Sequence, residues 1–292
     1  MQIKSNIWKK ETSKGTLFIK KYDHLNVAEK VKTIHSQLES IKFPYILPLV
    51  KSKDEDLIIQ YWQHGSFSAD FSNDSHRKQS FKILQALHET SDKIDWKNEV
   101  ILPKQRLYQK WNARLERFII NEKELLPYLQ HAYYDITLYA SRVLKQMRKQ
   151  KQMVNGKLTL LHGDVVHHNF LICKDKKMKL IDFDLAVVGD SAEEMILWMH
   201  RVLPTIDYNL KKLLNENPYL YTLCLPKINF LQYPNELLRE WLYVLQLGKY
   251  EREAFLDYLM PFTEKALRHW PDLIMETEKL AASTPRSNFK IE

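Results

Sequence analysis

The chain has 292 residues, of which 45% are hydrophobic and 27% are charged, a balance typical of a globular protein with one or two domains. Its formal net charge is +8, but the lysines are scattered, which favours a solvated surface over a nucleic-acid-binding face. Cys173 and Cys224 are too few for a disulfide framework. We see no signal peptide and no run of 18 apolar residues, so we expect a cytoplasmic protein without a membrane span.

The first 62 residues predict a small β-rich lobe. The predicted order is strand, strand, helix, strand and strand, over residues 3–12, 16–22, 26–41, 45–50 and 57–62. Alternating side chains indicate the strands, and apolar residues at helical spacing indicate the helix. We expect Asn26 to cap this helix, with Glu29 at the capping-box position three residues later.

The rest of the chain predicts a larger, mainly helical lobe. Residues 63–74 are typical of a linker, and the second lobe covers residues 75–292. The long helical stretches predicted in its first half are 76–90, 105–120 and 122–150. A compact β-rich block follows, before the chain becomes helical again. The predicted fold class is therefore α+β, with two lobes.

The densest chemical signal is the sequence HGDVVHHN, followed by IDFD. Phosphoryl transfer needs one carboxylate to orient the attacking hydroxyl, and an amide with a second carboxylate to hold Mg²⁺. His162, Asp164 and Asn169 have the spacing of the protein-kinase catalytic loop, with Gly163 in place of its arginine. The next two predicted strands form a hairpin that returns Asp182 to Asn169, and oxygen ligands of this kind suit Mg²⁺.

The segments HGDVVHHNF and LIDFD closely resemble the motif pair of aminoglycoside phosphotransferases and choline kinases. Within that group, the chain looks most similar to a bacterial branch of spore-coat-associated kinase-like proteins. The resemblance covers most of the chain. It implies a two-lobed protein-kinase-like fold, with a reduced N-terminal lobe, and a phosphotransferase that uses ATP and Mg²⁺ to modify a hydroxyl group of a small molecule.

The resemblance also implies roles for the residues of the motif pair. Asp164 would be the catalytic base, and His162 would brace the loop through backbone hydrogen bonds. Asn169 and Asp182 would bind Mg²⁺, while Asp184 would either assist the metal or organise the loop.

Further roles fall on the first lobe. Lys20 would contact the nucleotide phosphates, whereas its neighbour Lys21 would face the opposite side of the strand. Glu29 would be the ion-pair partner of Lys20, with Glu39 on the same predicted helix as its rival. The adenine would be received by Gln60, Tyr61 and Trp62.

Some features depart from the family pattern. Only one strand is predicted before the turn at Gly15, and no glycine-rich phosphate-binding loop precedes Lys20. Glu193 and Glu194 stand near the place where the family carries a supporting aspartate. These departures favour an alternative, a kinase-fold pseudoenzyme with a binding or structural role, associated with spore-coat proteins. The intact set Asp164, Asn169 and Asp182 favours an enzyme. The hypothesis that the chain binds nucleic acid rests on its net charge alone.

Overall fold

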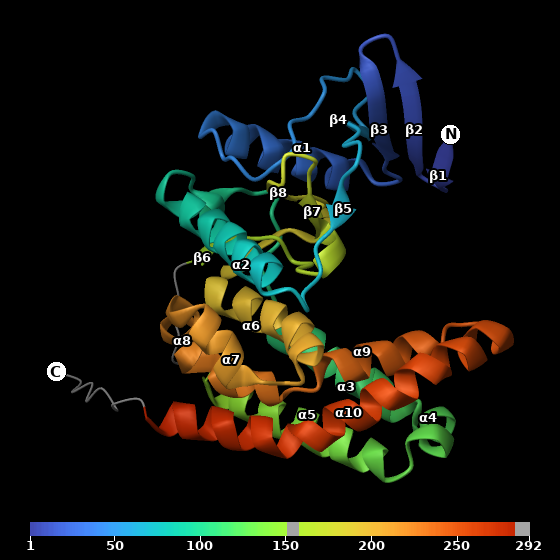
Figure 1. The fold of residues 1–292 in the computed structure, drawn as a ribbon, viewed down its shortest axis with the longest axis vertical. Coiled ribbons are helices and arrows are strands. Elements are labelled where there is room, and N and C mark those ends of the chain that lie inside the picture. The colour runs from blue at the N-terminus through green and yellow to red at the C-terminus, as the bar shows by residue number, and fades with distance from the viewer. Residues whose placement is uncertain (151–157, 284–292) are drawn as a thin grey trace. The chain divides into compact units, whose positions relative to one another are not determined.

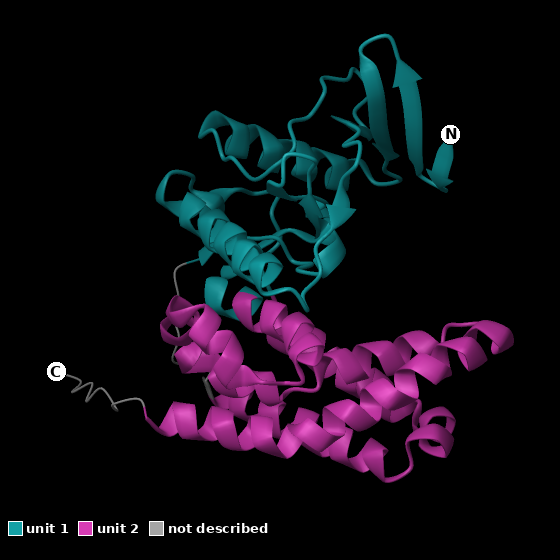
Figure 2. Cartoon of the chain, in the orientation of Figure 1, with its two compact units in different colours: residues 1–105, 156–194 teal, residues 106–155, 195–292 magenta. Residues whose placement is uncertain are grey.

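The computed structural model describes residues 1–150 and 158–283. The chain divides into two compact units (Figure 2): residues 1–105 with 156–194, and residues 106–155 with 195–292. The linker predicted at residues 63–74 lies inside the first unit. None of the helices in the described residues combines the length and apolar character needed to cross a membrane.

The first unit begins with an antiparallel sheet in the strand order β1-β2-β3-β4 (Figure 1). Its strands are β1 (Gln2–Lys4), β2 (Ile7–Thr12), β3 (Gly15–Lys21) and β4 (Leu57–Tyr61). The single strand expected over residues 3–12 is therefore two strands, because the chain turns at Ser5 and Asn6. All three side chains of β1 are exposed. Because β1 has only three residues and the turn after it has two, the first strand and the loop that follows it are greatly reduced, as expected.

The strand expected over residues 45–50 is not formed. Leu49 makes only an isolated bridge to Gln60, and Val50 donates a hydrogen bond to the carbonyl of Ile59. Pro48 interrupts this segment, and proline has no N–H to donate to a strand ladder.

Helix α1 (Leu25–Ser40) packs through an apolar stripe that includes Ala28, Val31, Ile34 and Leu38. The expected cap at Asn26 is wrong, because the helix begins one residue before it. His24 occupies the N-cap position and makes no side-chain capping bond. Helical spacing thus located the helix, but not its first turn.

Two small sheets complete the first unit. β5 (Phe67–Ser68) pairs with β7 (Phe170–Ile172), and β7 pairs with β8 (Met178–Leu180) in the hairpin expected from the sequence. β6 (Leu158–Leu161) pairs with β9 (Val187–Asp190). Helix α2 (Asp74–Glu89) begins where the side chain of Asn73 accepts hydrogen bonds from two backbone N–H groups.

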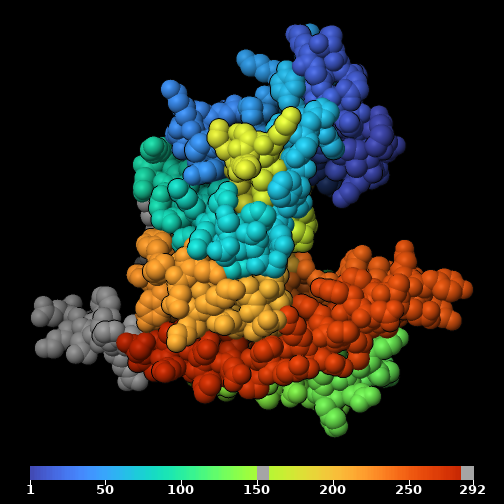
Figure 3. Space-filling model, viewed as in Figure 1, coloured from blue at the N-terminus to red at the C-terminus, as the bar shows by residue number. Residues whose placement is uncertain are grey.

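The described part of the second unit is helical. Its helices are α3 (Leu107–Ile120), α4 (Glu122–Leu129), α5 (His131–Gln150), α7 (Leu210–Glu216), α8 (Pro218–Cys224), α9 (Asn235–Val244) and α10 (Lys249–Ala282), with most of α6 (Ser191–Val202). Gln130 has a φ of 48° and separates α4 from α5, so the stretch expected as one helix over residues 122–150 is two. Side chains of α10 form a continuous strip on one face (Figure 3).

Large aromatic side chains form the core of the second unit. Trp111, Trp198 and Trp241 are fully buried. The Trp111 ring stacks on Tyr233, with the two centroids 4.1 Å apart, and the Tyr233 hydroxyl donates to the backbone carbonyl of Trp111. This core lies on helices α3, α6 and α9 and the segment that precedes α9.

Candidate active site

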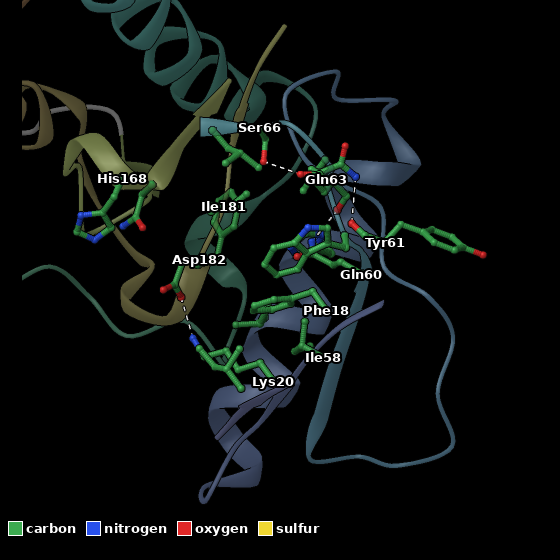
Figure 4. A pocket seen from close by; sticks show the side chains of 18 of the residues that line it. Phe18, Lys20, Ile58, Gln60, Tyr61, Gln63, Ser66, His168, Ile181 and Asp182 are labelled. Atoms are coloured by element: carbon green, nitrogen blue, oxygen red, sulfur yellow. Dashed lines mark hydrogen bonds and ion pairs between the residues drawn. The ribbon is translucent and has the colours of Figure 1, made fainter. Parts of the chain in front are cut away.

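A cavity of about 310 Å³ lies within the first unit (Figure 4). Its wall is largely apolar, with a few polar groups, as is typical of small-molecule sites. Six residues nominated from the sequence line it: Lys20, Gln60, Tyr61, Trp62, Asn169 and Asp182. The cavity is not lined by Asp164, His162, Asp184 or Glu29, although Asp184 directly follows Phe183, which lines it.

Strand alternation brings Lys20 to the cavity. Phe18, Lys20 and Tyr22 all line it from β3 and the residue after that strand. Lys21 points to the other face, where its Nζ lies 3.5 Å from a carboxylate oxygen of Asp56. Of the two adjacent lysines, only Lys20 can therefore act on a molecule in the cavity.

His162 holds the loop that follows β6. Its side chain is fully buried, and its two ring nitrogens lie 3.1 Å from the carbonyl oxygen of Asp164 and 2.9 Å from that of Ile181. The imidazole therefore links the loop to the residue that precedes Asp182. Backbone contacts of this kind are what the family resemblance implies for His162.

Gly163 is required by the close approach of two backbones. Its φ is +82°, and a Cβ atom at this position would lie 1.9 Å from the carbonyl oxygen of Leu185. Real Cβ atoms do not come so close to backbone atoms. Glycine therefore stands before Asp164 for steric reasons as well as for its left-handed conformation.

The β7–β8 hairpin brings Asn169 and Asp182 to the same cavity. The N–H of Ile181 donates to the carbonyl of Asn169 over 3.0 Å. The Asn169 amide nitrogen donates to the backbone oxygen of Asp164 over 2.9 Å and to its carboxylate over 3.3 Å. This leaves the amide oxygen of Asn169 as an acceptor, and Asp182 adds a carboxylate. The pair fits a hard cation such as Mg²⁺, which takes few protein ligands.

Lys20 forms ion pairs with both acidic residues of the IDFD sequence. Its Nζ lies 3.0 Å from Asp182 and 2.6 Å from Asp184. Burial opposes the charge of Lys20, but these carboxylates raise its pKa. Burial also opposes the charge of Asp182, yet Lys20 lowers the pKa of that carboxyl. Burial raises the pKa of Asp184, and the charge of Asp182 adds to this effect.

The ion pair expected between Lys20 and Glu29 is not formed. Glu29 is exposed on α1, because its position lies off the helix face that packs against the rest of the unit. The rival, Glu39, accepts a hydrogen bond from the backbone N–H of Leu49 over 3.2 Å. Neither glutamate of α1 is therefore an ion-pair partner of Lys20.

Two further residues near Asp184 were missed from the sequence. The Tyr22 hydroxyl donates to Asp184 over 2.6 Å, and the buried Lys30 Nζ donates to the Asp184 carbonyl oxygen, also over 2.6 Å. Strand alternation could have pointed to Tyr22, which follows Lys20 by two positions. Nothing in the sequence marks Lys30 as buried.

A buried acidic contact supports the loop from behind. Glu194 Oε1 accepts the N–H of Gly163 over 2.7 Å, and its Oε2 lies 2.8 Å from His88 Nε2. Burial opposes ionisation of Glu194, but the hydrogen bonds from His88 and Gly163 lower its pKa. Glu194 thus takes the supporting position that the sequence indicated for Glu193 or Glu194.

Comparisons with known proteins give a consistent assignment. A model of the phosphotransferase enzyme family matches residues 59–206, just over half of the chain. A search of curated protein sequences finds no match.

Solved structures resemble most of the chain. An aminoglycoside phosphotransferase from Alicyclobacillus acidocaldarius is 16% identical with a TM-score of 0.67, over 95% of this chain and 92% of that one. A spectinomycin phosphotransferase, solved with ADP and spectinomycin, is 15% identical with a TM-score of 0.62, over 96% and 92%. A choline kinase from Streptococcus pneumoniae is 10% identical with a TM-score of 0.51, over 97% and 92%. The kinase-like α+β fold expected from the sequence is confirmed.

Proposed function

The chain belongs to the phosphotransferase enzyme family, and we propose that it transfers the γ-phosphoryl group of ATP to a hydroxyl group of a small molecule. The observation that carries the proposal is the cavity that gathers Lys20, Asn169 and Asp182 beside the loop of Asp164. The solved relatives are named for phosphoryl transfer to an aminoglycoside, to spectinomycin or to choline. Their names support a small-molecule acceptor, and neither a nucleic acid nor a membrane is needed as a partner.

In this proposal, the cavity holds the nucleotide. The adenine lies against the segment Gln60 to Trp62, and the ammonium group of Lys20 contacts the phosphates. Asn169, through its amide oxygen, and Asp182 would hold Mg²⁺, which when bound neutralises charge on the phosphate oxygens.

Asp164 would act on the acceptor. Its carboxylate accepts the hydrogen bond of the attacking hydroxyl and takes up its proton as the new oxygen–phosphorus bond forms and the bond to ADP breaks. Asn169 and His162 hold the Asp164 backbone, so the carboxylate is oriented before the acceptor arrives. Such positioning accounts for much of the rate enhancement in phosphoryl transfer.

The reduced first strand favours a second candidate function. β1 has three exposed residues, and only Ser5 and Asn6 separate it from β2. A two-residue turn covers the phosphates less than a long loop would. A kinase-fold protein that binds other proteins, such as those of a spore coat, is therefore the alternative.

Transfer of labelled phosphate distinguishes the two candidates. The purified protein would be mixed with Mg²⁺, terminally labelled ATP and a panel of aminoglycosides, spectinomycin and choline. We expect a labelled product with wild type and a loss of at least about a hundredfold in rate with Asp164→Asn. Asp175→Asn, in the exposed β7–β8 turn, is the matched control. Normal turnover by Asp164→Asn would refute the mechanism, and no transfer to any acceptor would favour the alternative.

A further inference from the structure

Helix α1 offers no carboxylate to the cavity. In protein kinases, a glutamate on the helix after the lysine strand holds the phosphate-binding lysine in place. Here, the α1 residues that line the cavity are Val31 and His35. Glu29 is exposed, and Glu39 is bonded to the backbone of Leu49. The phosphate-binding lysine must therefore be positioned from elsewhere.

Asp184 has the contacts that such a partner needs. Its Oδ2 lies 2.6 Å from Lys20 Nζ, and its Oδ1 accepts the Tyr22 hydroxyl over 2.6 Å. Its backbone oxygen accepts Lys30 Nζ, which also reaches the carbonyl of Ala186 over 3.3 Å. The two carboxylate oxygens of Asp184 are thus held by Lys20 on β3 and by Tyr22 just after it, and its backbone oxygen is held by Lys30 on α1.

Burial separates the roles of the two aspartates. The side chain of Asp182 is 45% exposed and that of Asp184 is 28% exposed, while Lys20 is only 13% exposed. The shorter and more buried of the two ion pairs is the one to Asp184. Charge-assisted hydrogen bonds strengthen as they lose contact with water. Asp182 is the more open residue, and it lines the cavity (Figure 4).

We infer that Asp184 is the positioning residue for Lys20, in the place that a helix glutamate takes in protein kinases, and that Tyr22 and Lys30 hold Asp184 in that position. The metal-binding groups are then the carboxylate of Asp182 and the amide oxygen of Asn169. The inference rests on the proposed function only where it concerns nucleotide binding. The contact between Asp184 and Lys20 can also be tested in the protein alone.

The first test measures the reactivity of the Lys20 amine without any ligand. An acylating reagent would label the protein, and peptide mass spectrometry would give the rate at Lys20 relative to Lys21. An amine that is hydrogen-bonded to a carboxylate and largely buried is shielded from the reagent and reacts slowly. We expect Asp184→Asn to raise this ratio about tenfold and Tyr22→Phe to raise it less, while Glu29→Gln leaves it unchanged. An unchanged ratio in Asp184→Asn, or an equal rise in Glu29→Gln, would overturn the inference.

Lys30 has a matched control on the same helix. Lys32 also donates to two backbone carbonyls, those of Asp54 and Glu55, and neither belongs to Asp184 or to a residue next to it. We expect Lys30→Met to raise labelling of Lys20 and Lys32→Met not to do so. Equal labelling in the two variants would remove Lys30 from the set. If Lys30→Met does not fold, Tyr22→Phe, which removes one hydroxyl, decides whether Asp184 is held as we infer.

The second test separates positioning from metal binding. ATP affinity would be measured by calorimetry, first in a chelator and then with Mg²⁺. We expect Asp184→Asn to weaken metal-free binding about tenfold, as Lys20→Met does, and Asp182→Asn to lose only the gain from Mg²⁺. If Asp184→Asn lost only the increase in ATP affinity that Mg²⁺ gives, Asp184 would be a metal ligand and the inference would be wrong. If wild type bound no ATP, the proposed function would fail, and the labelling test would still decide the inference.

Discussion

At the scale of single residues, Gly163 shows how tightly the candidate active site is packed. A methyl group there would meet the carbonyl oxygen of Leu185 at 1.9 Å. Gly65 also has a positive φ, of 69°, but nothing lies within 4 Å of its Cβ position. Substituting alanine at Gly65 would therefore measure the cost of the left-handed backbone alone, and at Gly163 the same cost with a steric clash added.

We predict that Gly163→Ala lowers the free energy of unfolding by more than about 3 kcal/mol, whereas Gly65→Ala costs about 1 kcal/mol. Urea denaturation of both variants measures the difference. Equal losses would mean that the loop moves aside without cost and that the close approach to Leu185 is not a constraint.

His35 gives the protein a defined sensitivity to acid. It lies edge-on to Phe183, with ring centroids 5.6 Å apart, and its Nδ1 has no hydrogen-bond partner in the described residues. Burial lowers the pKa of His35 from 6.5 to about 4. As the pH falls through this interval, the unfolded chain takes up a proton that the folded chain refuses. Folding is therefore destabilised between pH 6.5 and pH 4, and the effect is absent above pH 7.

We predict that His35→Leu flattens this part of the stability curve. Relative to the variant, wild type should lose about 3 kcal/mol between pH 7 and pH 4. Denaturation at a series of pH values gives both curves. Parallel curves would show that His35 takes up its proton as readily in the folded protein as in the unfolded chain.

At the scale of elements, the loop before Asp164 is fixed by two helices. His88 lies on α2 and Glu194 on α6, and the Glu194 carboxylate joins His88 to the N–H of Gly163. Both side chains are buried. Removing the carboxylate leaves a buried imidazole and a partly buried N–H without their partner, which is costly in a low-dielectric interior.

We predict that Glu194→Ala lowers the free energy of unfolding by about 3 kcal/mol, and that Glu194→Gln, which keeps an oxygen for Gly163, costs less. Because the pKa of Glu194 is lowered on folding, its contribution is complete above pH 4.5 and is lost as the pH falls below that value. Denaturation at neutral pH, with Glu193→Ala as the neighbouring control, measures the effect. No difference between Glu194→Ala and Glu193→Ala would exclude the supporting role.

The elements also show what a single sequence reveals. Alternation located β3, β4 and the β7–β8 hairpin, and helical spacing located α1, which buries a stripe of apolar residues. The sequence did not reveal the turn at Ser5 and Asn6 or the break at Gln130, since neither position has a glycine or proline to mark it. The strand expected over residues 45–50 is not formed, because Pro48 has no N–H to donate to a ladder.

The same limit applies to the site. The predicted hairpin between the two motif segments placed Asp182 beside Asn169, and a hairpin of fixed register brings them together. The ion-pair partner of Lys20 could not be predicted in this way, because it depends on the rotation of α1 about its own axis, which decides whether Glu29 or Glu39 faces the cavity. Helix rotation is set by tertiary packing of Ile34 and Leu38, and no local pattern encodes which carboxylate then lies nearest to the lysine.

At the scale of the whole molecule, the residues proposed to bind nucleotide all belong to the first unit. The family match begins at residue 59, so it does not include β3 and Lys20. Family membership alone therefore leaves open whether this first sheet serves a nucleotide. The short β1 and its two-residue turn make this the central question about the protein.

Calorimetric titration with ATP, with and without Mg²⁺, in wild type and Asp182→Ala answers that question most directly. We predict binding that Mg²⁺ strengthens in wild type, and loss of that strengthening in Asp182→Ala, because a carboxylate ligand of the cation is removed. Such a result would show a working nucleotide site beneath a reduced first strand. No binding by wild type at millimolar ATP would contradict the account and favour a protein-binding role.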